Sequence, residues 1–258
     1  MKIRRETWQR YIDALRLIDE KAAAEMRRYI GPDRWPDTEE GVELLIRYAY
    51  RIAGKYGEAA ATLAAEMYDA TALLSGIHLP SAIPAETATL HETAKAVVGT
   101  LKTGNEEIVT GAVKRLVRMA GQDTTLQNAR RDGAQWAWIA SGDTCAFCIA
   151  LAANGWQNAS KKTMKGKHAE HIHANCDCAF AIRFDSGSEV EGYDPETYER
   201  MLYPENDELD GESWEMHIDG LRRRLYAENR ETINAQKRSA YAKRQERESS
   251  RAEEADIT

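Results

Sequence analysis

The stretch SGDTCAFCIALAANGWQNASKKTMKGKHAEHIHANCDCAFAIRF, residues 141–184, decides the fold of this chain. It holds all four cysteines of the sequence, at Cys145, Cys148, Cys176 and Cys178. The first two form a Cys-x2-Cys pair and the last two a Cys-x-Cys pair, with 27 residues between the pairs. The sequence on either side is mostly helical in its pattern, so we expect a helical scaffold around this stretch.

The cysteine spacing fits a zinc site. Two cysteines three positions apart form a knuckle, and residues two apart on an extended segment face the same side. His173, three positions before Cys176, adds a nitrogen ligand. A tetrahedral zinc needs four ligands, and one held entirely by protein is structural rather than catalytic. The candidate ligands are Cys145, Cys148, His173, Cys176 and Cys178.

Three simpler interpretations of the cysteines remain open. The thiols can pack as small buried hydrophobic groups, or they can pair as disulfides in a particle that has left the cell. Cys145 and Cys148 can also act as a redox pair. The redox pair is the least favoured, because no βαβ pattern surrounds it and no proline lies between the two cysteines.

The same stretch resembles the Mu F-like minor capsid proteins of tailed phages, whose motif runs Asp-x-Cys-x2-Cys, a variable loop, and His-x2-Cys-x-Cys. The matching residues are Asp143, Cys145, Cys148, His173, Cys176 and Cys178. Two further segments, YGEAAATLAAEMYD at 56–69 and EGYDP at 191–195, resemble the subgroup found in prophages of Gram-positive bacteria. The resemblance covers roughly residues 40–240.

This resemblance implies a head morphogenesis protein that associates with the portal in procapsid assembly and stays in the virion. The implied partners are the portal protein and other capsid components, with DNA as a further candidate. We expect no catalytic reaction, no small-molecule substrate and no membrane partner. The implied location is the host cytoplasm during assembly and then the virion head, and the cofactor that the cysteines suggest is a structural Zn²⁺.

Composition agrees with a globular chain made in the cytosol. Charged residues make up 30% and hydrophobic ones 43% of 258 residues, enough for one sizeable core or two small ones. The sequence has no apolar run long enough to span a membrane, and its first residues, MKIRRETWQR, lack the apolar segment of a signal peptide. Clustered cysteines in the cytosol favour a metal or thiols over disulfides.

Helical periodicity predicts a bundle before the cysteine stretch. Apolar residues recur every three or four positions over residues 4–29, and from a capping box at Asp37 and Glu40 to about Leu74. Within the second helix, Gly54 and Gly57 predict the close approach of another helix. Shorter helices are expected over residues 85–101, 106–120 and 124–133, after a proline-containing loop at 75–86.

The cysteine stretch itself predicts a small α/β module. AQWAWIA, residues 134–140, is apolar on both faces and predicts a buried strand, which Cys145 and a short helix then follow. CAFAIRF, residues 178–184, predicts an antiparallel second strand. We therefore expect an α+β, mostly helical fold. Its three parts are a helical region at 1–122, a Mu F-like cysteine and histidine module at 123–184, and an acidic linker with a long basic C-terminal helix or tail at 185–258.

Charge is distributed unevenly at the C-terminal end. Residues 185–219 carry 13 acidic side chains and one arginine, whereas residues 221–251 carry 10 basic and four acidic ones. A basic segment of this kind can bind the phosphate backbone of DNA in packaging or ejection, or it can be a solvated face. The candidate DNA-binding residues are Arg222, Arg223, Arg224, Lys237, Arg238, Lys243 and Arg244.

Two classes of enzyme share part of the pattern. Zinc deaminases combine His-x-Glu with Cys-x2-Cys, but here the His168-to-Glu170 triplet follows the cysteine pair instead of preceding it. A metal-dependent nuclease of the His-Asn-His type is the stronger rival, because a histidine-rich segment follows the knuckle. Its further ligands would have to be Asn206 and His217, in an acidic stretch that repels DNA, so a structural role is favoured.

Overall fold

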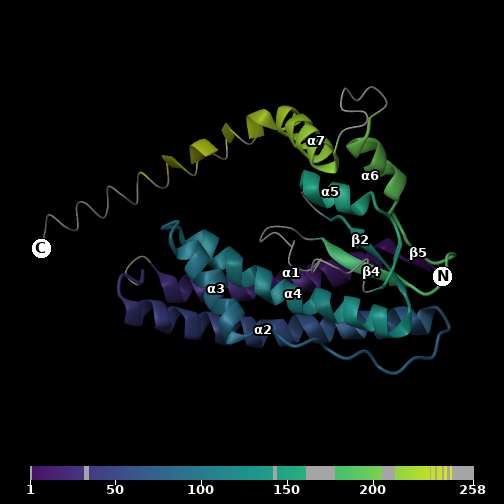
Figure 1. Ribbon diagram of the computed structural model, residues 1–258, viewed down its shortest axis with the longest axis horizontal. Helices are drawn as coiled ribbons and strands as arrows, with labels where there is room; N and C mark the ends of the chain where they lie inside the picture. The colour runs from purple at the N-terminus through teal and green to yellow at the C-terminus, as the bar shows by residue number, and fades with distance from the viewer. Residues whose placement is uncertain are drawn as a thin grey trace, which may run out of the picture. The chain divides into compact units, whose positions relative to one another are not determined.

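Helices make up most of the chain in the computed structural model (Figure 1), which confirms the α+β, mostly helical class. The chain divides into two compact units, Met1–Glu199 and Arg200–Thr258. The structure describes residues 2–31, 35–141, 144–160, 178–204 and 213–232, and also residues 234, 235, 237–239, 241, 242 and 245.

Four helices of the first unit form the expected N-terminal bundle. They are α1 (Arg5–Ile30), α2 (Glu39–Leu74), α3 (Leu90–Leu101) and α4 (Glu106–Asp132). Their common core contains fully buried aliphatic side chains from all four helices, among them Met26, Leu45, Val97 and Val113. The periodic stripes in the sequence therefore face one another, as amphipathic helices require.

The helix starts differ from the expected ones because threonine hydroxyls cap them. Thr38, and not Asp37, caps α2, since its Oγ1 accepts a hydrogen bond from the Gly41 amide at 3.0 Å. A capping box between Thr89 and Glu92 starts α3 at Leu90, five residues after the expected start. The residues before Thr89 do not form a helix, because side chains of α2 and α4 satisfy their backbone hydrogen-bonding groups.

α4 continues through the position where the sequence suggested a break between 120 and 124. The hydroxyl of Thr124 donates to the Ala120 carbonyl at 2.7 Å, and that of Thr125 to the Gly121 carbonyl at 3.4 Å. Both threonines therefore satisfy their polar groups within the helix, which removes the penalty for burying them. One helix of 27 residues replaces the two that were expected.

Glycine allows α4 to lie unusually close to α2. A Cβ atom at Gly121 would be only 3.1 Å from the Ala60 carbonyl oxygen, and one at Gly57 would be 2.9 Å from Cγ2 of Thr87. A Cβ atom at Gly54, in contrast, would have nothing within 4 Å. The expected close approach of another helix thus occurs at Ala60, opposite Gly121, and not at Gly54, while the tight neighbour of Gly57 is Thr87 in the segment between α2 and α3.

A buried ion pair joins α1 to α4. Asp19 and Arg118 have side chains that are only 2% and 7% exposed, and the Arg118 Nε donates to the Asp19 carboxylate. Asp19 is therefore buried, although a charged residue in an amphipathic helix is ordinarily expected on its solvent face. Asp19 lies on the face of α1 that packs into the bundle core, and a buried carboxylate needs a cationic partner there.

A three-stranded antiparallel sheet follows the bundle and confirms the two expected strands. β2 (Gln135–Ile139) pairs with β4 (Ala179–Arg183), and Trp138 lies directly opposite Phe180. The third strand, β3 (Gln157–Asn158), pairs with the other edge of β2 and is too short to be visible in the sequence pattern. The strand order is β3-β2-β4.

Both faces of this sheet are buried, as the apolar alternation in β2 predicted. One face carries Trp136, Trp138, Phe180 and Ile182, which pack with residues of α2, α4 and the short helix after the first cysteine pair. The opposite face carries three alanines and Ile139, and it packs against Trp8, Tyr11 and Ile12 of α1. The large side chains therefore define one core and the small ones allow α1 to approach the other face.

The remaining elements are short. β1 (Lys2–Ile3) pairs in parallel with β5 (Glu189–Val190), a contact that the sequence did not predict. The short helices α5 (Ala146–Ala152) and α6 (Pro195–Leu202) match the expected turns of helix, and the last helix, α7 (Trp214–Glu228), starts after Ser213. Among the described residues, no helix is both long and apolar enough to cross a bilayer.

The second unit is built on α7. The buried residues of α7 are His217, Ile218, Gly220 and Leu221. His217 lies against the ring of Tyr203, at 4.6 Å between centroids. Trp214 and Leu225, near the two ends of α7, are half-buried, so the helix is most deeply buried in its middle. Arg224 donates to the carbonyl of Met201 at 2.8 Å, at the C-terminal end of α6.

We predict that Gly121→Ala destabilises the chain. The added methyl group meets a helix backbone that cannot move alone, and such overpacking costs about 1–3 kcal/mol, against a gain in helix propensity of about 1 kcal/mol. Gly54→Ala on α2 is the matched control, because open space surrounds it. Urea denaturation should show a lower midpoint for the first variant and an equal or higher one for the second. Equal stabilisation by both would contradict the close contact.

Candidate cysteine site

The first cysteine pair lies at the start of α5. Cys145 is the residue before the helix, with an extended backbone, and its carbonyl accepts the first helical hydrogen bond from Ile149 at 3.0 Å. Cys148 follows one turn later and is fully buried, whereas Cys145 is half-buried. A helix start stabilises thiolates, so this position suits a metal ligand as well as a packed thiol.

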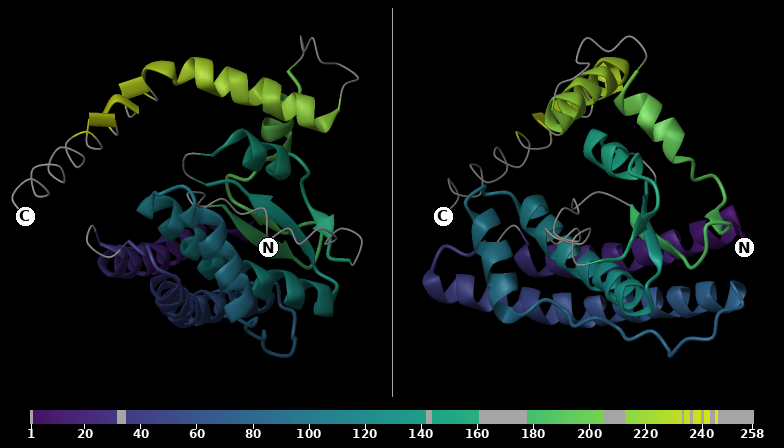
Figure 2. Two further views of the ribbon diagram at one scale, coloured as in Figure 1. Left: turned by 60° about the vertical axis from the view of Figure 1, so that its left-hand side comes forward. Right: turned by 45° about the vertical axis from the view of Figure 1, so that its right-hand side comes forward.

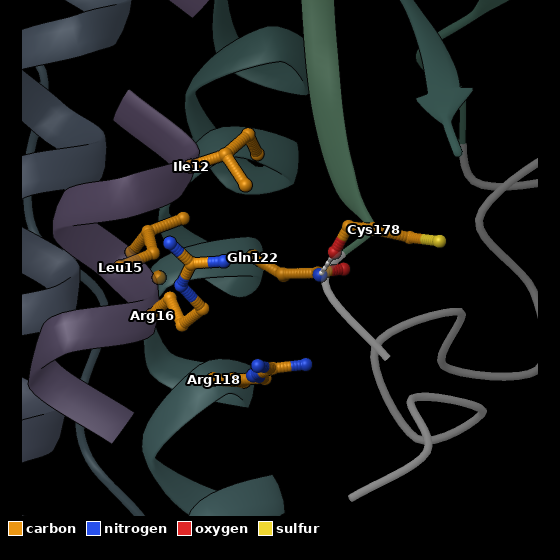
Figure 3. Close-up of a pocket in the computed structure, with 7 residues that line it drawn as sticks. Ile12, Leu15, Arg16, Arg118, Gln122 and Cys178 are labelled. Carbon is orange, nitrogen blue, oxygen red and sulfur yellow. Dashed lines mark hydrogen bonds between the residues drawn. The ribbon is translucent and has the colours of Figure 1, made fainter. Parts of the chain in front are cut away.

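Cys178 lies at the entry to β4 and is held by α4. Its main-chain oxygen accepts a hydrogen bond from Nε2 of Gln122 at 2.9 Å, while its sulfur points away from that helix (Figure 3). Because alternate residues of a strand share a face, the Cys178 side chain lies on the same face as Phe180. It is 3% exposed.

The two ends of the cysteine motif meet in one core. Cys148 and Cys178 belong to the same buried cluster as Trp136, Trp138 and Phe180, and Cys145 packs against that cluster. The Phe180 ring lies edge-on to both tryptophans, with centroids 5.0 Å and 4.9 Å away. Cysteines from separate parts of the sequence are thus close in space, which is what the interpretation as one module required.

The remaining candidate ligands, His173 and Cys176, lie outside the described residues, as does Asp143. In the described part of the chain, no group of three or more His, Cys, Asp or Glu side chains is arranged to hold a metal ion. The three described cysteines have the thiolate chemistry that zinc prefers, but they supply fewer than the four ligands of a structural site. The zinc site therefore stays a prediction.

The EGYDP segment, residues 191–195, is built into the same region. The Tyr193 hydroxyl donates to the Ala152 carbonyl at the end of α5 at 2.8 Å, and the Glu191 carboxylate accepts from the Arg5 amide at 3.1 Å. Asp194 accepts from the Glu196 amide and the Thr197 hydroxyl, so it caps the start of α6. This short segment joins the N-terminus, α5 and α6.

A small pocket lies between α1 and α4 next to Cys178 (Figure 3). It gives the centre of a water molecule about 20 Å³ of space, and one water needs about 10–15 Å³ on that measure. Oε1 of Gln122 is buried and has no hydrogen-bond partner in the described chain, so a water here fits as its donor. The pocket has room for solvent rather than for a substrate.

Gln122 and the ion pair between Asp19 and Arg118 are the residues that sequence reasoning missed. Each is a polar side chain within an apolar helical stripe, and this interruption is the only signal for them in the sequence. His78 and His91, which lie outside the cysteine stretch, are both exposed.

The candidate DNA-binding arginines of α7 differ in their contacts. Arg222 pairs with Asp219, and Arg224 binds the main chain of α6, whereas the Arg223 Nε makes a long contact of 3.4 Å to the Asp219 carbonyl. Lys237 and Arg238 are exposed, and Lys237 lies over the Tyr226 ring at 5.3 Å. Lys243 and Arg244 lie outside the described residues. DNA binding by this segment stays a prediction.

The comparisons with known proteins give one match. A family model described as VG15 protein matches residues 2–204, which include the bundle, the sheet, the cysteine cluster and α6. No curated protein and no solved structure gives a significant match to the chain.

We predict that a metal chelator distinguishes the zinc site from packed thiols. Loss of a structural metal removes several kcal/mol, and each kcal/mol shifts Tm by about 2–4 °C in a chain of this size. Chelator should therefore lower the Tm of the parent by more than about 5 °C and leave the variant Cys145→Ala/Cys178→Ala unchanged. If the double variant also melts within about 2 °C of the untreated parent, the cysteines hold no structural metal.

We also predict that the chain loses stability above about pH 10. Burial raises the pKa of the Tyr11, Tyr68 and Tyr193 hydroxyls well above their ordinary value of 10.0. These groups ionise first in the unfolded chain, so their contribution to stability is complete below pH 10 and declines above it. Above about pH 10, each such tyrosine lowers the free energy of unfolding by about 1.4 kcal/mol per pH unit.

Thermal melting at pH 8 and at pH 11 measures this slope. Tyr193→Phe should flatten it, since one of the hydroxyls whose pKa burial raises is removed. Tyr241→Phe, which removes an exposed hydroxyl, is the control. A slope that Tyr193→Phe does not change would show that this hydroxyl ionises equally in both states.

Proposed function

We propose that this chain, which belongs to the VG15 protein family, is a minor capsid protein of a tailed phage or prophage. It acts in head morphogenesis, where it associates with the portal during procapsid assembly. The functional part of the proposal comes from the resemblance of residues 141–184 to Mu F-like minor capsid proteins.

The observation that carries the proposal is the convergence of the motif in space. Cys145 and Cys148 meet Cys178 in one apolar core, although residues 149–177 separate Cys148 from Cys178 in the sequence. EGYDP, the other quoted segment of the resemblance that lies near this motif, bonds to α5 through Tyr193. Segments that resemble the family at separate places thus contribute to one structural module.

The arrangement suits a structural role rather than catalysis. Cys148 and Cys178 are buried among aromatic rings, where a substrate would have to displace packed side chains to reach them. The cysteines lie where a cross-link or a metal would fasten α5 to β4. We therefore propose that the module locks the sheet, with Zn²⁺ as its candidate cofactor, and that the helices dock on the portal and other capsid components.

The proposed location follows from this role. The chain would be made in the host cytoplasm, would join the procapsid there and would remain in the virion head. The long helices of the first unit offer surfaces for docking, including the exposed apolar side chains Leu17, Leu44 and Tyr50. No enzymatic step is part of the proposal.

Quantitative mass spectrometry of purified particles from a producing strain tests the proposal. We expect the chain in full heads at a few copies per portal, and the same copy number after the particles have been emptied if it only scaffolds the head. A copy number that falls on emptying would show ejection with the genome. Absence from both full and emptied particles would contradict a virion role and would direct attention to the nuclease and assembly-factor alternatives.

A further inference from the structure

The segment between α2 and α3 is extended but firmly held. Residues 77–89, IHLPSAIPAETAT, which we call the strap, run back along α2 (Figures 1 and 2). In the described chain, residues 78–88 make no hydrogen bond between main-chain groups. An ordered segment with this property must satisfy its backbone elsewhere.

Side chains of α2 and α4 supply the partners of this backbone. The Ala82 amide donates to Asp69 at 2.8 Å, and the Ala85 amide donates to Thr124 at 2.8 Å. The Asn128 side chain binds both main-chain groups of Ile83, accepting from its amide at 3.0 Å and donating to its oxygen at 2.9 Å.

Two further donors from α4 complete this recognition. Arg131 donates to the main-chain oxygens of Pro80 at 2.9 Å and Ser81 at 3.1 Å, and Gln127 donates to that of Ile83 at 2.6 Å. Asp132 holds the Arg131 guanidinium through two contacts of 2.7 Å, and the hydrogen bond from Arg131 keeps the pKa of the Asp132 carboxyl below its ordinary range. The groove between α2 and α4 thus binds main-chain atoms.

The strap shows a period of three in its burial. From Leu79 to Ala85 the half-buried residues are Leu79, Ala82 and Ala85, whereas Pro80, Ser81, Ile83 and Pro84 are exposed. Beyond Ala85 the pattern is less regular, because Glu86 is exposed but both Thr87 and Ala88 are half-buried. A polyproline II helix has three residues per turn and no internal hydrogen bonds. Leu79, Ala82 and Ala85, at every third position, therefore face α2 and α4, and the prolines face solvent. Ile83 is 61% exposed even though its backbone is bound on both sides.

We propose that the groove between α2 and α4 is a binding site for an extended peptide main chain, and that the strap is its built-in occupant. A segment of a partner protein with small residues at every third position, and with proline between them, can take the same place. Nothing in the recognition depends on the identity of the outward side chains, because the contacts are made to backbone amides and carbonyls.

The proposal requires that the strap can leave the groove without unfolding the bundle. It is a connection between two helices, it adds few large side chains to the core, and its ends stay attached to α2 and α3. A competing peptide meets no topological barrier, but it must compete with a segment that is covalently present at high effective concentration. The intact chain should therefore bind such a peptide weakly, and a chain without a competent strap should bind it well.

Replacing residues 79–88 with a Gly/Ser segment of equal length tests this in the full chain. The probe is a labelled synthetic peptide of residues 77–89, and binding is measured by fluorescence anisotropy. We expect the replaced chain to bind it at least tenfold more tightly than the parent does. A peptide of the same composition, scrambled so that the period of three is lost, is the control and should bind at least tenfold more weakly. Equal binding of both peptides, or none, would overturn the proposal.

Amide hydrogen exchange of the unmodified chain gives an independent test should the replaced chain fail to fold. The amides of Ala82, Ile83 and Ala85 are protected by side chains only, so we expect them to exchange at least tenfold faster than the buried amides of α2 near Ala64. If they exchange only as fast as the whole bundle unfolds, the strap cannot leave the groove and the proposal is wrong.

Discussion

The contact between α2 and α4 is the constraint on which the rest of the first unit depends. Gly121 lets the α4 backbone approach the Ala60 carbonyl, and Gly57 lets the strap approach α2 on the same line of contact. This contact fixes the spacing of the two helices. The groove that holds the strap and the surface that carries the sheet, through Leu126 and Ala129 of α4, both follow from it.

The sheet and the cysteine cluster build outward from this platform. Gln122 on α4 fixes the main chain at Cys178, and the aromatic residues of β2 and β4 then enclose the sulfur-bearing side chains. Tyr193 ties the far end of α5 to the segment after β5. The cysteines are thus the innermost part of a module whose position is set by α4, which explains why two distant segments of sequence can form one site.

Much of this fold could be predicted because the patterns are local. Periodic apolar residues indicated α1, α2 and α4, and the double-sided apolar run in QWAWI indicated β2. Side-chain capping and long-range pairing could not be predicted in this way. Thr38 and Asp37 are equally plausible caps in sequence, and β1 has only two residues, whose pairing with β5 spans almost the whole first unit. The burial of Asp19 depends on how α1 is rotated relative to α4, and the sequence of α1 alone does not specify that rotation.

The candidate site could be predicted only in part. The spacing of Cys145 and Cys148 indicated a knuckle at a helix start, and this is where they lie. The contribution of Gln122 depends on the contact of α4 with the entry of β4, so the sequence of either segment alone does not reveal it. The strap is the clearest example of the difference. Its prolines predicted a loop, but only the tertiary contacts with Asn128 and Thr124 show that this loop is bound as an extended peptide.

The dependence of the sheet on the two helices can be measured directly by native-state hydrogen exchange at increasing denaturant. We predict that the amides of α2 and α4 near Ala60 and Gly121 are among the slowest to exchange. Those of β2 and β4 near Ala137 and Ala181 should open with the same free energy or a lower one. Sheet amides that stay protected after the amides at the α2–α4 contact have exchanged would contradict the claim that this contact carries the module.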